Sequence, residues 1–367
     1  MPRDGRMRWK RAGSKPSCAT CTATCIARHS PTLSSTSVQR RANAFDFLET
    51  VHCVWRRAMQ LTAACLPPPE NYAAPDFQVP ARACDSHCHV TPEDFLNTVP
   101  DASYEPAPAP PAELRRLRRS IKFERSVVVQ ASVYGKDNRA VEQALRAEPQ
   151  VLRGVVVGDA DTTDAQLDAW HAMGVRGMRF IMSGQLGGTV DLNDLKVLAP
   201  KLADRGWHAE ILPREDQWPS LKSTLEQLPC TLVVDHLGGL SLGAQSGEAE
   251  RVLSSLLSTG RVWVKLIGYR LSADLRDPRI ARRAQRLYSE APTRMVWGTD
   301  WPHVAFSVEQ DAGVLLNALA SWFDHDASAI ERILAANPEE LFDFPRAAVR
   351  MDPVDPIIVT GTPQRRT

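Results

Sequence analysis

From about residue 80 onward, short runs of Val, Ile and Leu alternate with longer segments whose apolar residues recur at helical spacing. The short runs contain few polar residues, which is typical of parallel strands covered on both faces. They predict strands at residues 83–87, 126–131, 151–157, 174–181, 207–212, 231–235, 262–266 and 295–298. The amphipathic segments predict helices at residues 137–147, 163–173, 191–205, 246–259, 279–290 and 308–322.

Eight strand–helix units over about 250 residues have the size and rhythm of an α/β fold of the (β/α)8 TIM-barrel type. An open doubly wound sheet is the alternative, and it usually carries a glycine-rich phosphate turn after its first strand. No G-x-G-x-x-G pattern follows the first predicted strand, where His87 and His89 stand instead. The pattern therefore favours a TIM barrel over residues 79–348.

The ends of the chain differ from the barrel in composition. Arg, Lys, Ser and Thr are frequent from Met1 to Arg41, where Asp4 is the single acid. This composition is typical of an organelle transit peptide. It is also what results when the start codon is assigned too far upstream. We favour the second interpretation, with Met59 as an internal start. We expect residues 1–78 to be a low-complexity extension that is disordered or misassigned, and residues 349–367 to be a polar tail.

Charge and cysteine content narrow the class of partner. The formal net charge of +1 gives no electrostatic footprint for nucleic acid. No apolar run reaches the roughly 18 residues that a transmembrane helix needs. Eight unevenly spread cysteines indicate a reducing compartment rather than a disulfide scaffold. We therefore expect a cytoplasmic protein that acts on a small molecule and has neither nucleic acid nor membrane as its partner; the oligomeric state stays open.

Ionisable and polar residues stand at the ends of nearly all predicted strands. In a barrel the active site lies at the carboxyl ends of the strands, and polar groups are costly in a core unless they are paired. His87 and His89 share one face of the first strand, so their rings point into the same space. Other members of this strand-end set are Ser132, Arg179, Asp235, His236, Lys265, Arg270 and Asp300. Packing alone does not explain such a set, which predicts an active site.

The residue types in this set suit hydrolysis. Asp300 can take a proton from water as general base. His87, His89 and His236 can polarise the carbonyl under attack, with or without a metal. No G-x-S-x-G segment indicates a serine nucleophile.

The cations of the set need anionic partners. A buried guanidinium is costly without one. For Arg179 the partner is a substrate carboxylate or a protein acid, and we favour the substrate. We make the same prediction for Arg270. Lys265 is expected to pair with an acid inside the barrel.

Five segments, in this order, resemble the amidohydrolase superfamily: DSHCHV, VVVQASVYGKDN, GVRGMRF, VVDHLGG and WGTDWPH. They are most similar to its amidohydrolase-related group, which contains 2-pyrone-4,6-dicarboxylate lactonase. The resemblance covers roughly residues 80–345. It implies a TIM barrel with a central catalytic set of His87, His89, His236 and Asp300. It further implies substrate contacts by Tyr104, Ser132, Arg179 and Arg270.

The chain departs from the lactonase pattern in two places. Gln185 stands where that group has a further arginine, and Leu212 or a neighbour replaces a tyrosine at the end of the fifth strand. Loss of a bidentate arginine contact costs roughly a few kcal/mol. We therefore expect a lactone with one carboxylate, or with a different polar group, rather than the pyrone dicarboxylate itself.

The resemblance leaves two possibilities for cofactors, none required or a single zinc-like divalent metal. Binuclear members of the superfamily add a bridging lysine on the fourth strand and a histidine ligand on the fifth. Here the fourth strand has an arginine, and His208 is out of phase to serve as the fifth-strand ligand, which argues against a binuclear site. If one ion is bound, His87, His89 and Asp300 are its expected ligands.

The sequence thus predicts a hydrolase of a small carboxylated lactone or cyclic ester. The alternatives are a metal-dependent decarboxylase or hydratase of the same superfamily, and a non-catalytic protein that binds small acids.

Overall fold

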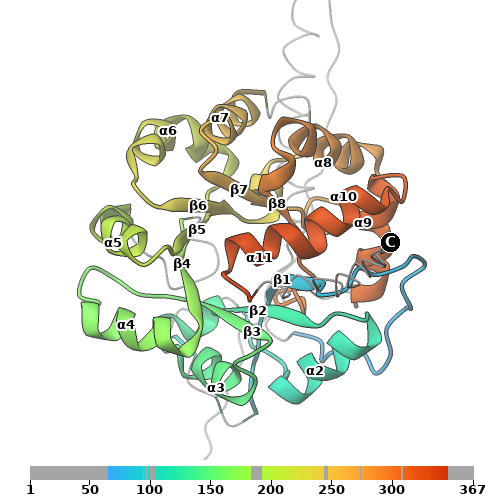
Figure 1. The fold of residues 1–367 in the computed structure, drawn as a ribbon, viewed down its shortest axis with the longest axis horizontal. Helices are drawn as coiled ribbons and strands as arrows, with labels where there is room; N and C mark the ends of the chain where they lie inside the picture. Colours follow the sequence, from blue (N-terminus) through green and yellow to red (C-terminus); the bar gives the residue numbers. More distant parts are fainter. Residues whose placement is uncertain are drawn as a thin grey trace, which may run out of the picture. The chain divides into compact units, whose positions relative to one another are not determined.

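The computed structural model describes residues 65–345, except positions 94, 96, 97, 100, 101, 103, 183–191, 244–246, 273, 307 and 308. Eight parallel strands follow one another around a sheet in sequence order (Figure 1). Backbone hydrogen bonds join the first strand and the residue after it to the segment that follows the last strand, from Ser86 N to Trp297 O at 2.9 Å and from His89 N to Trp301 O at 2.7 Å. The predicted (β/α)8 barrel is confirmed. Most of the predicted N-terminal extension and the whole predicted C-terminal tail lie outside the described residues.

The strands form where the apolar runs predict them, with ends that differ by no more than two residues. They are β1 (Cys84–Cys88), β2 (Arg125–Val129), β3 (Leu152–Val156), β4 (Val175–Ile181), β5 (His208–Leu212), β6 (Thr231–Val234), β7 (Val262–Lys265) and β8 (Met295–Val296). Nearly every strand residue is buried, as expected when helices cover the outside and side chains fill the inside.

Helices surround the sheet (Figure 1). Those predicted from periodicity are α3 (Arg139–Ala147), α4 (Asp164–Met173), α5 (Leu192–Asp204), α7 (Gly247–Leu257), α8 (Pro278–Glu290) and α9 (Ala312–Trp322). The sequence did not predict α2 (Pro111–Ser120), α6 (Trp218–Gln227), α10 (Ala327–Glu331) or α11 (Asn337–Leu341). α2 begins at Pro111, and a proline in the first turn of a helix loses no hydrogen bond. No helix in the described part combines the length and apolarity needed to cross a bilayer.

The segment that follows the last barrel helices closes one end of the barrel. Leu341, Phe342 and Phe344 pack with the inward-facing residues of the strands, and α11 lies across this end (Figure 1). Arg125, the first residue of β2, pairs with Glu339 at 3.0 Å and lies over the Phe344 ring. The amino ends of the strands are therefore sealed, which leaves chemistry to the opposite end.

Residues 65–80 pack against the barrel, although their composition assigns most of them to the extension. The Tyr72 hydroxyl accepts a hydrogen bond from Trp301 Nε1 at 2.8 Å. The backbone N–H of Ala73 donates to the Asp311 carboxylate at 2.9 Å, and this carboxylate also caps α9. This segment therefore supports the loop that follows β8.

Candidate active site

Asp300, four residues beyond the end of β8, is the centre of a buried polar cluster. Its Oδ2 accepts hydrogen bonds from Arg270 Nε and, at 2.7 Å, from the Tyr269 hydroxyl. Its Oδ1 lies 3.2 Å from His89 Nε2 and 3.6 Å from His87 Nε2. The fold therefore gathers predicted residues from both sides of the barrel around one carboxylate.

The third predicted histidine belongs to the same cluster. His236 Nδ1 lies 3.9 Å from Asp300 Oδ2, and the ring centroids of His236 and His87 are 5.2 Å apart. The His87 and His89 rings are 5.0 Å apart and perpendicular. Two histidines at i and i+2 do point into one space, as the strand period predicts.

The backbone around these residues adopts uncommon conformations. Asp300 has φ 59° and His236 has φ 50°, in the left-handed region that non-glycine residues rarely occupy. The Asp300 N–H donates to His87 O at 2.7 Å, and its carbonyl accepts from His303 N at 2.8 Å. Such conformations cost free energy and tend to cluster at functional sites. Here they turn the two side chains into the mouth of the barrel.

Asp85 connects β1 to the end of β8 below the cluster. Its carboxylate accepts from Thr299 N at 2.9 Å, Thr299 Oγ1 at 2.6 Å and His87 N at 3.2 Å. The register between β1 and β2 shifts between Asp85 and Cys88, an irregularity of the kind that re-aims side chains. Burial raises the pKa of Asp85 to about 6 against these hydrogen bonds. We assign Asp85 to holding His87 and Asp300 in place.

Electrostatics keep Asp300 ionised and two of its histidine neighbours, His87 and His236, neutral. Burial would raise the pKa of Asp300, but the charge of Arg270, with His236 and the His89 contact, holds it well below its usual range. Burial lowers the pKa of His236 to about 4. Burial and Lys265 hold the pKa of His87 well below its usual range. The cluster therefore presents an anionic base beside the neutral imidazoles of His87 and His236.

Both predicted substrate arginines pair with acids of the protein. Arg270 pairs with Asp300, and its guanidinium lies 5.0 Å from the Phe306 ring centroid. Arg179 pairs with Asp235 at 3.1 Å, approaches Glu210 at 3.5 Å and donates to a backbone carbonyl. A substrate carboxylate at either arginine would share the guanidinium with these acids.

The other two predicted substrate contacts lie together. The Tyr104 hydroxyl is 3.3 Å from Ser132 Oγ, and both side chains are buried. Burial raises the pKa of Tyr104 to about 12, so its phenol keeps its proton and can donate. Leu212 is half-buried at the end of β5. Gln185 lies outside the described residues, so the predicted loss of an arginine contact there stays a prediction.

Sequence reasoning missed Tyr269 as a partner of Asp300. Its only signal was its place beside Arg270 in the segment after β7. The acid predicted to pair with Lys265 inside the barrel is Glu210, a residue that the sequence did not identify.

The nitrogen and oxygen atoms of the cluster can be compared with the ligand set that a metal ion needs. Among the described residues, ligand atoms of His87, His236 and Asp300 lie within 4.8 Å of one another. His87 Nε2 and His236 Nδ1 have no hydrogen-bond partner in the described part of the chain. His89 donates from Nδ1 to Val129 O at 2.8 Å, as metal-bound histidines commonly do. Two or three imidazoles with a carboxylate fit one zinc-like ion, provided that His87 Nε2 carries no proton.

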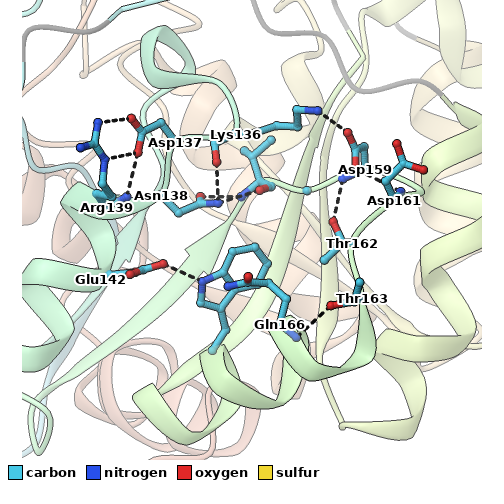
Figure 2. A pocket seen from close by; sticks show the side chains of 13 residues that line it. Lys136, Asp137, Asn138, Arg139, Glu142, Asp159, Asp161, Thr162, Thr163 and Gln166 are labelled. Carbon is cyan, nitrogen blue, oxygen red and sulfur yellow. Dashed lines mark hydrogen bonds and ion pairs between the residues drawn. The ribbon is translucent and has the colours of Figure 1, made fainter.

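A hollow lies apart from this cluster, between the loops that follow β2 and β3 (Figure 2). Its volume is about 460 Å³, and its lining includes the Lys136–Asp159 and Arg139–Asp137 ion pairs. Glu142 and Trp170 also line it, and Glu142 accepts a hydrogen bond from Trp170 Nε1 at 2.9 Å. None of the predicted site residues lines it, so the candidate site is the cluster around Asp300.

Comparisons with known proteins agree with this cluster. The family described as Amidohydrolase matches residues 84–344. The 2-pyrone-4,6-dicarboxylate hydrolase of Comamonas testosteroni is 34% identical over 285 residues, which cover 74% of this chain and 93% of that relative. The 4-sulfomuconolactone hydrolase of Rhizobium radiobacter is 28% identical over 286 residues, which cover 76% and 95% of the two chains. The crystal structure of a probable 2-pyrone-4,6-dicarboxylic acid hydrolase from Acinetobacter baumannii, with citric acid bound, matches with a TM-score of 0.65 at 25% identity, over 72% of this chain and 100% of that one.

Proposed function

Because the chain belongs to the amidohydrolase family, we propose that it hydrolyses a small carboxylated lactone or a related cyclic ester. One observation supports this most: a buried, ionised Asp300 lies 3.6 Å from His87 and 3.9 Å from His236, whose imidazoles are neutral, at the mouth of the barrel. That is a general base placed beside groups that can polarise a carbonyl. The relatives named above are hydrolases of a pyrone dicarboxylate and of a sulfonated lactone, which supports a small anionic substrate.

In the proposed reaction, water adds to the lactone carbonyl carbon while Asp300 takes its proton. Oδ1 is the oxygen available for this step, because Oδ2 already accepts from Arg270 and Tyr269. Histidine N–H groups stabilise the negative charge that develops on the carbonyl oxygen. When the ring C–O bond breaks, Asp300 returns the proton to the leaving oxygen, and the product is an open-chain carboxylic acid.

The remaining predicted residues bind and orient the substrate in this proposal. Tyr104 and Ser132 lie within hydrogen-bonding reach of each other and offer hydroxyl donors. Arg270 and Arg179 can each contact one carboxylate at the edge of their ion pairs. Since both guanidinium groups are already shared with protein acids, we propose a substrate with one carboxylate rather than two.

A metal-dependent decarboxylase or hydratase is the second candidate, favoured by the donor set at the cluster. His87, His236 and Asp300, with His89 beside them, would hold a single divalent ion. Such an ion would polarise a carbonyl and lower the pKa of a water molecule. Elemental analysis of the purified protein, with activity measured before and after a chelator, separates this candidate from the first.

We also propose that the protein acts in the cytoplasm. Cys65, Cys84, Cys88 and Cys230 are free thiols, as expected in a reducing compartment.

The deciding experiment follows acid release from a panel of monocarboxylated, dicarboxylated and sulfonated lactones. We expect turnover to be fastest with one of the monocarboxylated members. Asp300→Asn should lower kcat/KM by about 10²–10⁴, the usual contribution of a general base. Asp161→Asn, at an exposed acid, is the matched control. Full activity of Asp300→Asn would remove Asp300 from its role, and binding of lactone acids without turnover would favour the non-catalytic alternative.

A further inference from the structure

A charged group of four side chains lies inside the barrel beside His87: Arg179, Glu210, Asp235 and Lys265. All four are buried, and Glu210, Asp235 and Lys265 are completely so. Lys265 pairs with Glu210 and lies 3.4 Å from Asp235 Oδ1. Arg179 pairs with Asp235 at 3.1 Å. Two cations balance two anions, and three of the four have no part in the proposed reaction.

Lys265 also contacts the ring of His87. Its Nζ lies 2.9 Å from His87 Nδ1. An ammonium group has three donors and no acceptor, so Nδ1 must accept in this contact and cannot carry a proton. A neutral imidazole has one N–H, which must then be on Nε2.

Lys265 Nζ has two carboxylates as partners besides His87 Nδ1, those of Glu210 and Asp235. Burial and Asp235 would raise the pKa of Glu210, but Lys265 lowers it below its usual value. Burial would also raise the pKa of Asp235, but the charges of Lys265 and Arg179 lower it below its usual value. Asp235 Oδ1 lies 3.3 Å and Glu210 Oε1 3.6 Å from His87 Nδ1. These oxygens would accept a proton from Nδ1 if the lysine charge were absent.

We propose that Lys265 is a positioning residue that holds His87 in the Nε2–H tautomer, so that this N–H is the donor toward the carbonyl oxygen of the substrate. His87 Nε2 has no hydrogen-bond partner among the described residues, and it lies 3.6 Å from Asp300 Oδ1. A polar hydrogen held unpartnered next to the general base is what a carbonyl-polarising role requires. The same proton occupies the lone pair that a metal would need, so Lys265 disfavours metal binding by His87.

The first test measures the tautomer in the unmodified protein. Two-bond ¹⁵N–¹H correlation spectra of ¹⁵N-histidine protein separate the two tautomers from the imidazolium. Nine histidines give signals, and His87 is assigned by the signal that disappears in His87→Gln. We expect a neutral Nε2–H ring near pH 7. A ring protonated on Nδ1, or on both nitrogens, would overturn the proposal whether or not any variant folds.

The second test removes the charge of Lys265 together with that of Glu210, so that no unpaired buried acid is left. In Lys265→Met combined with Glu210→Gln, we expect the His87 proton to move to Nδ1 and donate to Asp235. Glu210→Gln alone is the matched control, because it keeps the ammonium and should keep the Nε2–H form. If the control also loses this form, or the double variant keeps it, the lysine is not the cause.

The kinetic half of the inference rests on the proposed lactone hydrolysis. Loss of one donor to a developing oxyanion lowers kcat by about 10²–10³. We expect this loss in the double variant relative to Glu210→Gln, with KM little changed, because the contact strengthens only in the transition state. A double variant with the moved proton and an unchanged kcat would refute the role. Absence of turnover on all lactones would refute the proposed function and leave the tautomer measurement valid.

Discussion

Tyr269→Phe should raise the pKa of Asp300, because it removes one of the two strong donors to Oδ2. The hydroxyl donates to that oxygen at 2.7 Å in a buried site. A hydrogen bond to a charged group contributes about 1.5–3 kcal/mol, and one pKa unit corresponds to 1.36 kcal/mol. The expected rise is therefore about one to two units. The ring itself should stay, because its contacts with His303 and Phe306 do not use the hydroxyl.

The sign of the effect on activity follows from the role of Asp300 as a base. Activity is lost as the pH falls through the pKa of the base, so a raised pKa moves the acid limb of kcat/KM to higher pH. The assay is the pH profile of kcat/KM with the best lactone of the panel. The matched control is Tyr288→Phe, which packs on Phe323 away from the cluster.

The same substitution should act on stability in a defined pH range. Asp300 has a pKa well below its usual value, so its contribution to folding is present above about pH 4 and is lost as the pH falls through the folded-state pKa. Tyr269→Phe should therefore lower the free energy of unfolding at pH 7 and lose that difference in acid. An acid limb that stays in place, in a variant that is folded and active, would refute the assignment of Tyr269 to the base.

Two further predictions concern the support of the cluster. Tyr72→Phe should leave the Trp301 indole N–H without its acceptor, which costs about 1–3 kcal/mol of folding free energy. We expect Tm to fall by several degrees in thermal unfolding followed by circular dichroism. An unchanged Tm would show that residues 65–80 do not support the loop after β8. Gly298→Ala should disturb the cluster directly, because a Cβ there would lie 2.6 Å from the Cβ and backbone N of His87. We expect it to lower kcat by more than tenfold in a protein that still folds, as a displacement of catalytic groups would; wild-type kinetics would show that the backbone can move aside.

The fold could be predicted because most strands contain a short run rich in Val, Ile and Leu that ends at polar residues, although β1 (CDSHC) does not. The histidine pair could be predicted because side chains alternate along a β-strand, so residues two apart lie on the same face. The partner of Arg179 could not be predicted, since Asp235 follows β6 and meets Arg179 of β4 across β5, a contact that depends on the register and tilt of three strands. The start of α2 was hidden because Pro111 is neutral at a helix start and also typical of loops.

The arrangement around Asp300 reconciles two demands that oppose each other. A carboxylate held by Arg270 and Tyr269 is a weaker base than a free one, yet it stays ionised although it is buried. Those donors occupy Oδ2 and leave Oδ1 facing the histidines, so the proton transfer and the carbonyl polarisation are directed to one side. A lactone is an activated ester whose leaving oxygen stays attached to the product, so a modest base in a fixed position suffices. The charged group behind His87 fits the same logic, because it sets where a proton sits while adding no net charge to the site.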